Sequence, residues 1–309
     1  MKNVLTLIAI LVSTLVANAQ TIYSKAFGNS SDKPIIFLHG GPGYNSVAFE
    51  ATTAKRLSEN GFYVITYDRR GEGRSADGNA AYTFDETQKD LNALLDQYQL
   101  KSVTLVGHSF GGIIATMFAE KHPNKVESVI LVGAPLSMQE TFATITESCK
   151  AIYQSKNDST NLGYITMLEN MDKSSLKYSS YCFTHAMQNG FYYPKQTSAE
   201  AMGIYQQFRT DSLLVKYSSQ MSYDAPTGFW KNEQYTSLNL TDKLSQVVKN
   251  GTPVYGLYGT DDGLFSEAHV GEIKGIIGEN NLNYLSNCSH NVFIDQQTTF
   301  VDAIKGWVK

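Results

Sequence analysis

Cysteine, proline and clustered positive charge are all scarce in this chain. Its 309 residues include 3 cysteines and 7 prolines, and 25 Lys and Arg stand against 29 Asp and Glu. No dense Lys/Arg cluster occurs, which argues against a nucleic-acid partner. No Cys/His spacing typical of a metal site occurs either, so we expect neither a metal nor an organic cofactor.

The few cysteines leave two interpretations open. Cys149 and Cys182 fall in one stretch of the chain and are the first candidates for a disulfide, while Cys288 stands apart. An odd number leaves at least one thiol unpaired. Three buried free thiols are the alternative.

Long apolar runs are absent beyond the N-terminus. Residues 1–19 contain Lys2, an apolar run from 4 to 16, and Ala17-Asn18-Ala19. This pattern predicts a signal peptide cleaved near Gln20, since the run is shorter than the roughly 20 residues of a spanning helix. We therefore expect an exported protein, periplasmic or extracellular, with no stable membrane insertion after cleavage.

Apolar and aromatic residues are plentiful enough for a large core. The hydrophobic share is 42% and the charged share 17%, which excludes a disordered chain. The length suits one large domain, or one domain with an insertion.

Apolar strands alternate with helices on both sides of a long central insertion, which predicts an α/β fold with a mostly parallel central sheet flanked by helices. Ligands gather at the carboxyl ends of the strands in such sheets. The expected strands are 22–27, 34–38, 62–67, 103–106, 126–132, 253–258 and 282–285. The expected helices of these parts are 46–60, 84–99, 113–121, 267–277 and 298–308.

The insertion covers residues 136–250 and lacks buried strands. It is rich in aromatic residues and predicts a helical cap, inserted after the sixth strand and lying over the carboxyl ends of the sheet. Residues 20–135 and 251–309 then form the core.

A Gly-x-Ser-x-Gly sequence joins an apolar strand to a helix at Gly107 to Gly111. A serine at such a strand-turn-helix junction adopts a strained backbone conformation that exposes its hydroxyl. Ser109 is therefore the predicted nucleophile. A buried N-cap serine is the alternative.

A serine hydroxyl needs an adjacent base, and the chain contains 6 histidines. His290 follows the last strand, at the sheet edge where Ser109 lies, and is the predicted base. The others belong to glycine turns, where they brace loops, to a helix end, to the cap or to a surface helix: His39, His108, His122, His185 and His269.

The base needs a carboxylate to hold its tautomer. Asp261 and Asp262 both follow the strand at 253–258, and the Gly-x-x-Asp spacing favours Asp262. Asp261 stays open as the alternative acid, with capping of the next turn as its other role.

A tetrahedral intermediate needs hydrogen-bond donors for its oxyanion. The N–H of Phe110 begins the helix after Ser109 and is one expected donor. The second is the N–H of Gly41 in the turn His39-Gly40-Gly41-Pro42-Gly43, where glycine allows close approach of substrate.

These features together resemble the α/β-hydrolase superfamily over nearly all of the mature chain, including its order Ser, Asp, His. The HGGPG turn at 39–43 and the D-x-R-G-x-G-x-S loop at 68–75 are similar to the prolyl aminopeptidase (proline iminopeptidase) branch. That resemblance implies release of an N-terminal residue, often proline, from small peptides. The family's elbow usually has the form G-x-S-W-G, whereas His108 and Phe110 flank the serine here, as in esterases and C–C hydrolases.

In that family, cap carboxylates bind the substrate's ammonium group. No spacing selects one here, and the candidates that the cap offers include Glu140, Glu147, Glu169, Glu200, Asp211, Asp224 and Glu233. The sequence favours a secreted serine hydrolase that acts on small peptides through an acyl-enzyme. A carboxylesterase, or another hydrolase of small acyl substrates or C–C bonds, is the alternative. A non-catalytic binding protein would not need Ser109, His290 and Asp262 together.

Overall fold

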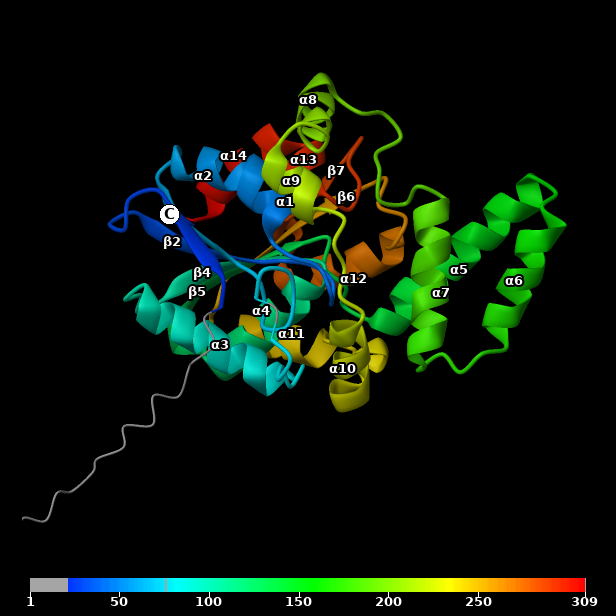
Figure 1. The fold of residues 1–309 in the computed structure, drawn as a ribbon, viewed down its shortest axis with the longest axis horizontal. Helices are drawn as coiled ribbons and strands as arrows, with labels where there is room; N and C mark the ends of the chain where they lie inside the picture. Colours follow the sequence, from blue (N-terminus) through cyan, green and yellow to red (C-terminus); the bar gives the residue numbers. More distant parts are fainter. Residues whose placement is uncertain (1–21, 76, 309) are drawn as a thin grey trace, which may run out of the picture.

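A central sheet of seven strands organises the computed structural model, which describes residues 22–75 and 77–308 (Figure 1). The predicted signal peptide lies outside the described residues. The spatial order is β1-β3-β2-β4-β5-β6-β7, and only the β1–β3 pair is antiparallel. The strands are β1 (Ser24–Phe27), β2 (Lys33–Leu38), β3 (Phe62–Tyr67), β4 (Val103–His108), β5 (Val126–Val132), β6 (Val254–Gly259) and β7 (Leu282–Leu285).

The inner strands are apolar on both faces because helices cover both. In β2, Ile36 and Leu38 join the core on one side, and Ile35 and Phe37 join the core on the other. This alternation follows from side chains of a strand pointing to opposite faces in turn. It explains why the strands appear in the sequence as continuous apolar runs.

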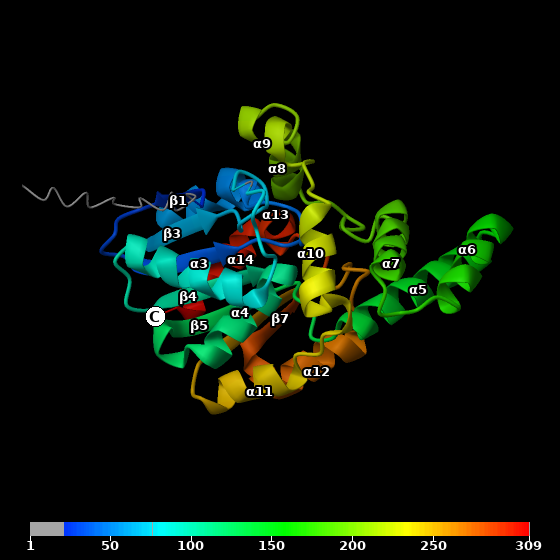
Figure 2. The ribbon, with the colours of Figure 1, turned by 60° about the horizontal axis from the view of Figure 1, so that its bottom comes forward.

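Two helical layers sandwich the sheet (Figure 2). One layer contains α3 (Phe84–Gln97), α4 (Phe110–Lys121), α11 (Thr241–Lys249) and α12 (Glu267–Ile277). The other contains α1 (Val47–Phe49), α2 (Lys55–Ser58), α13 (Val292–Asp295) and α14 (Gln297–Trp307). Helix α11 falls inside the predicted cap range, but its buried Leu244 and Val247 pack in the core layer.

The helix expected at 46–60 is interrupted. A π-helical segment, Glu50–Ala54, separates α1 from α2. Glu50 is only 3% exposed and accepts hydrogen bonds from Tyr23 and Thr66. The wider π-helical turn lets the buried Glu50 carboxylate face its partners. Because those partners are distant in the sequence, no local pattern predicts the interruption.

The cap follows β5, the fifth of the described strands, so our expectation of an insertion after the sixth strand was one strand too high. Its helices are α5 (Met138–Ser155), α6 (Ser159–Glu169), α7 (Leu176–Gln188), α8 (Ala199–Gln207), α9 (Ser212–Tyr217) and α10 (Asp224–Glu233). Helices α5, α6 and α7 form an arm that projects away from the sheet (Figures 1 and 2).

Short polar side chains start most cap helices. Each accepts a hydrogen bond from an N–H of the first turn, which satisfies a donor that the helix leaves free. These N-caps are Ser137, Asp158, Ser175, Ser198 and Asp211.

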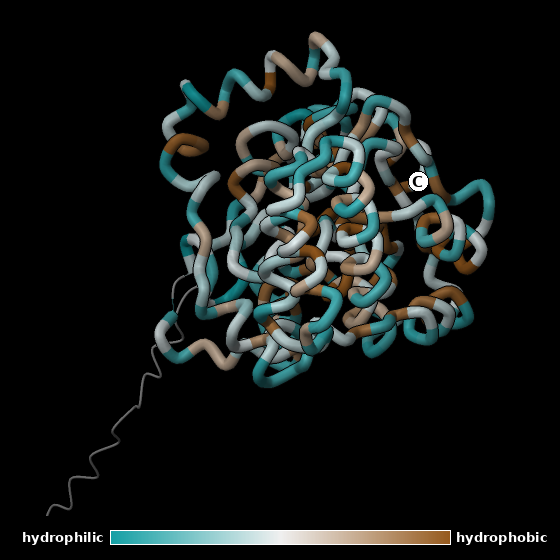
Figure 3. The backbone as a smooth tube through the Cα atoms, turned by 90° about the vertical axis from the view of Figure 1, so that its right-hand side faces the viewer, coloured by the Kyte–Doolittle hydropathy of each residue, from teal (hydrophilic) through white to brown (hydrophobic). Residues whose placement is uncertain are grey.

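Hydrophobic segments gather toward the interior, and hydrophilic ones dominate the outer turns (Figure 3). Within the described residues, no helix has the length and apolar character needed to cross a membrane.

Candidate active site

Ser109 occupies a sharp turn between β4 and α4. Its φ of +52° and ψ of −123° lie outside the common regions for residues with a side chain. Its hydroxyl makes no capping hydrogen bond to α4, so the N-cap alternative does not describe it. The Ser109 N–H instead donates to the Val132 carbonyl oxygen of the neighbouring strand, at 2.9 Å.

Two glycines make this turn possible. A Cβ at Gly107 would lie 2.6 Å from the Gly111 carbonyl oxygen, and a Cβ at Gly111 would lie 2.1 Å from the Leu38 carbonyl oxygen. Any side chain would force α4 away from β4 and β2. The Gly-x-Ser-x-Gly spacing is therefore a packing requirement of the elbow.

His290 and Asp262 lie together in the loops that follow β7 and β6. His290 Nδ1 is 2.8 Å from Asp262 Oδ2, and both side chains are buried. A carboxylate accepts only, so Nδ1 carries the proton and Nε2 is left as an acceptor. Asp262 Oδ1 accepts from the Leu264 N–H at 3.1 Å, which fixes the carboxylate plane.

The end of β5 brings the serine and histidine loops to one place. Val132 binds the Ser109 N–H, and a Cβ on the next residue, Gly133, would lie 3.1 Å from His290 Nδ1. His108, the neighbour of Ser109, also contacts the histidine loop: its Nε2 is 3.1 Å from the His290 carbonyl oxygen. Burial and the nearby His290 lower the pKa of His108 to about 3, so it braces this loop as a neutral ring.

Asp261 faces the cap rather than the histidine. Its Oδ2 accepts from the Lys195 N–H at 2.9 Å. The segment around it also contacts the cap, since the Gly263 N–H donates to the Phe191 carbonyl oxygen and the Phe191 ring packs on Gly263. Of the two candidate acids, Asp262 is the one beside His290.

A buried polar network ties the cap to the histidine loop, and no motif in the sequence pointed to it. Asp295 accepts from the N–H and hydroxyl of Ser289 and from the Tyr205 hydroxyl, at 2.6 to 2.7 Å. Tyr192 packs its ring edge-on to His290, with centroids 5.3 Å apart. Burial raises the pKa of Asp295.

The glycine turn 39–43 lies beside the elbow. A Cβ at Gly40 would be 3.2 Å from Ser109 Cβ, and Gly41 has a φ of +121° that glycine tolerates. His39 braces the turn, since its Nδ1 lies 2.8 Å from the Gly40 carbonyl oxygen and its Nε2 accepts from the Arg69 N–H. Burial and the charge of Arg69 hold the pKa of His39 well below its ordinary range.

Behind this turn lies an ion pair that the sequence did not reveal. Arg69 Nε is 2.9 Å from Glu72 Oε1, with exposures of 2% and 0% for the two side chains. Arg69 also donates to the carbonyl oxygens of His39 and Gly40. The only sequence signal was the presence of both charges inside the 68–75 loop.

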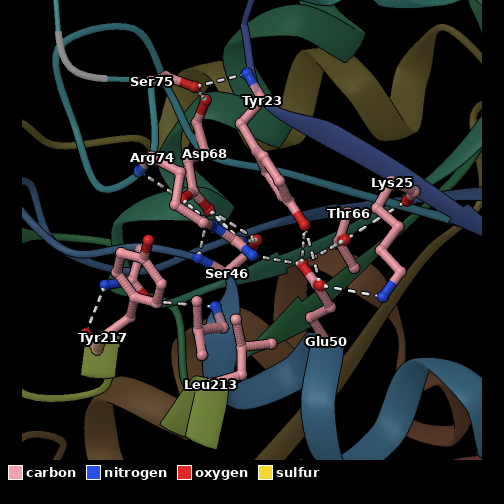
Figure 4. Close-up of polar contacts among 12 residues, drawn as sticks. Tyr23, Lys25, Ser46, Glu50, Thr66, Asp68, Arg74, Ser75, Leu213 and Tyr217 are labelled. Carbon is pink, nitrogen blue, oxygen red and sulfur yellow. Dashed lines mark hydrogen bonds and ion pairs between the residues drawn. The ribbon is translucent and has the colours of Figure 1, made fainter. Parts of the chain in front are cut away.

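A second cluster from the same loop surrounds Arg74 (Figure 4). Its guanidinium contacts Asp68 at 2.7 Å and Glu50 at 2.9 Å, and it lies 3.6 Å from the centroid of the Tyr23 ring. Burial alone would raise the pKa of Asp68, but the hydrogen bonds and charge of Arg74 hold it below its ordinary value.

The remaining candidate residues have structural surroundings. His269 is buried rather than on a surface helix, because the start of the cap covers α12 and the Leu136 N–H donates to His269 Nε2. Cys149, Cys182 and Cys288 are buried free thiols, so the structure has no Cys149–Cys182 disulfide. Among the described residues, no group of three or more His, Cys, Asp and Glu could hold a metal ion.

Comparison with known proteins decides the family. The model of the family described as the alpha/beta hydrolase fold matches residues 33–297. The chain belongs to this family. The α/β hydrolase architecture, the mostly parallel sheet and the helical layers agree with that match, and the chain is a hydrolase.

Relatives of this α/β hydrolase include both peptidases and esterases. It is 25% identical over 292 residues to the proline iminopeptidase of Lactobacillus helveticus, covering 93% of each chain. A proline iminopeptidase-related protein of Thermus thermophilus shares its fold with a TM-score of 0.67, 20% identity and 92% coverage of both chains. A structure from work on carboxylesterases of the thaumarchaeon Nitrososphaera gargenis has a TM-score of 0.62 at 20% identity, covering 94% of this chain and 96% of that one. The chain resembles the prolyl aminopeptidase branch within its family.

Proposed function

We propose that this α/β hydrolase is a serine hydrolase in which Ser109, His290 and Asp262 act together. The observation that carries the proposal is the 2.8 Å contact between His290 Nδ1 and Asp262 Oδ2 at the sheet edge that bears the Ser109 elbow. An aspartate on Nδ1 leaves Nε2 free to take the serine proton.

The proposed reaction is acyl transfer in two halves. His290 takes the Ser109 proton while the hydroxyl oxygen attacks the substrate carbonyl, and the N–H groups of Gly41 and Phe110 hold the oxyanion. His290 then gives the proton to the leaving group, which leaves an acyl-enzyme. Water, activated by His290, releases the acid and restores Ser109. No metal or organic cofactor enters these steps.

We propose a small peptide with a free N-terminus as substrate, cleaved in an aminopeptidase-like reaction. The proline iminopeptidase of Lactobacillus helveticus, similar over 93% of both chains, supports this choice. The leader pattern at 1–19 supports export to a periplasmic or extracellular site, with no nucleic-acid partner and no stable membrane insertion of the mature chain.

The proposal needs an anion for the substrate's ammonium group. Five of the seven candidate acids named from the sequence have other tasks: Glu140, Glu169 and Glu200 lie against basic side chains, Asp211 caps a helix, and Glu233 accepts from the Phe84 N–H. Of the other acids in 136–250, Asp158 and Asp172 accept from N–H groups of their own turns, and Asp242 lies on α11 of the core layer. Glu147 and Asp224 make no ion pair among the residues that the structure describes.

Asp224 is the better candidate of these two. It begins α10, and Phe229 of that helix packs 5.2 Å from the Phe110 ring, measured between centroids. Just before it, the Ser222 N–H donates to the Gly43 carbonyl oxygen of the glycine turn. Asp224 therefore belongs to the cap segment that contacts both proposed oxyanion elements, and we propose it as the ammonium ligand.

A substrate panel tests this function. Mature protein would be assayed on prolyl and alanyl arylamides, on their N-blocked forms and on short p-nitrophenyl esters, with Ser109→Ala as the blank. We expect turnover of the free-amine arylamides that N-blocking abolishes. Asp224→Asn should raise KM for the free amines by about tenfold or more, because a charge-assisted hydrogen bond is lost. Ester turnover should stay unchanged, and Glu147→Gln is the matched control.

The alternative is a carboxylesterase or another hydrolase of small acyl substrates. The carboxylesterase structure with a TM-score of 0.62 and the Phe110 that follows Ser109 favour it. Ester turnover with no arylamide turnover would select this alternative and reject the aminopeptidase.

A further inference from the structure

The ion pair Arg69–Glu72 lies behind the glycine turn that we propose as half of the oxyanion hole. Resting on that proposed function, we propose that Arg69 is a positioning residue. It holds the Gly40 carbonyl and thereby aims the Gly41 N–H at the substrate oxyanion.

Arg69 is built into the turn rather than placed near it. It is among the largest fully buried side chains of the described residues, at 2% exposure. Its Nη2 donates to the Gly40 carbonyl oxygen at 2.6 Å, and its Nη1 donates to the His39 carbonyl oxygen. A Cβ at Gly41 would lie 3.2 Å from Nη2, so the guanidinium contacts the very peptide that carries the donor.

The geometry of the Gly40–Gly41 peptide links this contact to the direction of the Gly41 N–H. The peptide between Gly40 and Gly41 is trans, since the cis bond of the turn joins Gly41 to Pro42. In a trans peptide the C=O and N–H point in opposite directions. With its carbonyl fixed on Arg69, the Gly41 N–H must point away from Arg69. No described residue accepts a hydrogen bond from it.

The hydrogen bond also strengthens the donor. A guanidinium on the carbonyl oxygen draws electron density along the amide, and hydrogen bonds in a chain polarise one another in a dry environment. Arg69 and Glu72 are neutral as a pair, so the influence on the oxyanion passes through the Gly40 amide rather than through a net charge.

Glu72 closes the other end of the turn. Its Oε2 accepts from the Gly43 N–H at 2.7 Å and from Arg69 Nη2 at 2.9 Å. The pair therefore holds two carbonyls at the start of the turn and one N–H at its end. Lysine offers a single ammonium without the planar fork and cannot reproduce this set of contacts.

The test measures Ser109 labelling by a fluorophosphonate, which depends on the nucleophile and the oxyanion hole and not on the choice between peptide and ester. We expect Arg69→Lys to lower the maximal labelling rate constant about 10²-fold, the scale of losing one oxyanion donor. The concentration for half-maximal rate should change little, because ground-state binding does not use the donor. Inhibition by an arylboronic acid, whose serine adduct is tetrahedral, should weaken in parallel.

Arg74→Lys is the matched control, because it changes a buried arginine of the same loop that does not touch the glycine turn. It should label at the wild-type rate. If Arg69→Lys does not fold, the double variant Arg69→Met with Glu72→Gln removes both buried charges and should show the same selective loss.

An unchanged maximal rate in folded Arg69→Lys or in the double variant would overturn the positioning role while leaving the proposed serine hydrolase intact. Equal losses in Arg69→Lys and Arg74→Lys would also overturn it, since both would reflect general loop damage. A wild-type chain that is not labelled at all would overturn the proposed function, and the positioning role with it.

Discussion

Arg69 and Arg74 come from one loop, and both are buried beside acids, but they hold different parts of the molecule. Arg69 binds carbonyls of the glycine turn next to Ser109. Arg74 binds Asp68, Glu50 and Ser46 and lies against the Tyr23 ring (Figure 4). The first cluster reaches the groups proposed to react, and the second joins the end of β3 to the start of the first helix.

This difference shows that burial of a charge does not reveal its role. Both pairs carry the cost of removing charges from water, and neither is a strong source of net stability. The two arginines differ in the groups that their guanidinium groups contact. Arg69 contacts a backbone carbonyl next to the proposed oxyanion donor, which links it to the proposed reaction. Among the described residues, Arg74 contacts only groups that hold the fold together, and removing it would leave buried carboxylates without their partner.

The largest expected effect sets the scale for this comparison. Ser109→Ala should lower turnover by on the order of 10⁴ to 10⁶, because the proposed nucleophile would act as a unit with its base. Both arginine clusters stay intact in this variant, so its urea unfolding midpoint should match the wild type. Turnover close to that of the wild type would show that Ser109 is not the nucleophile, and the proposed role of Arg69 depends on that nucleophile.

A second variant tests the acid on the reactive side. Asp262→Asn should lower kcat by about 10⁴, because the amide holds the wrong tautomer of His290. Asp261→Asn is the matched control, since Asp261 binds the Lys195 N–H instead, and its kcat should stay near the wild-type value. If Asp261→Asn lost activity while Asp262→Asn kept it, Asp261 and not Asp262 would be the acid that orients His290.

Arg74→Gln tests the structural side. Removing the guanidinium leaves Asp68 and Glu50 without their buried partner and should lower the free energy of unfolding by about 3 to 5 kcal/mol. Urea titration measures this loss, and active-site titration gives kcat per folded molecule, which should be unchanged. A fall in kcat of the fully folded variant as large as that of Arg69→Lys would erase the contrast between the clusters.

The smallest expected effect concerns pH and a group outside both clusters. Burial lowers the pKa of His269 from an ordinary value of 6.5 to about 4. Between pH 6.5 and pH 4, His269 therefore binds a proton in the unfolded chain but stays neutral in the folded chain. The free energy of unfolding falls as pH drops through this range. The share of His269 in this loss between pH 7 and pH 5 is about 2 kcal/mol.

His269→Gln should remove that share without changing kcat at neutral pH, since glutamine can still accept from the Leu136 N–H. Urea titrations at pH 7 and pH 5 measure the difference between variant and wild type. An equal pH dependence in both proteins would show that His269 does not titrate differently in the folded and unfolded states.

Much of the fold was predictable because its signals are local. The continuous apolar runs at β4 and β5 predicted buried parallel strands, and the structure has them at Val103–His108 and Val126–Val132. The interrupted helix at Glu50–Ala54 was not predictable, because the partners of Glu50 lie elsewhere in the chain. The buried position of His269 depends likewise on the start of the cap, far away in sequence.

The candidate site divides in the same way. Ser109, His290 and Asp262 carry signals in turn chemistry, in loop position and in residue type, and the structure brings His290 and Asp262 together. Their roles in a reaction stay predictions that the variants above test. Arg69 with Glu72, and Asp295 with Ser289, carried no comparable signal, because charged and hydroxyl residues are common in loops, and their burial here depends on segments distant in the chain.

The sequence by itself determined the elbow, the glycine turn and the alternation of strands and helices. These follow from backbone angles and apolar periodicity, which act over a few residues. Only the tertiary structure decided which aspartate faces His290 and which arginine faces the glycine turn. Hydrogen bonds are made or lost over a few tenths of an ångström, and that precision arises only when elements distant in the chain pack against one another.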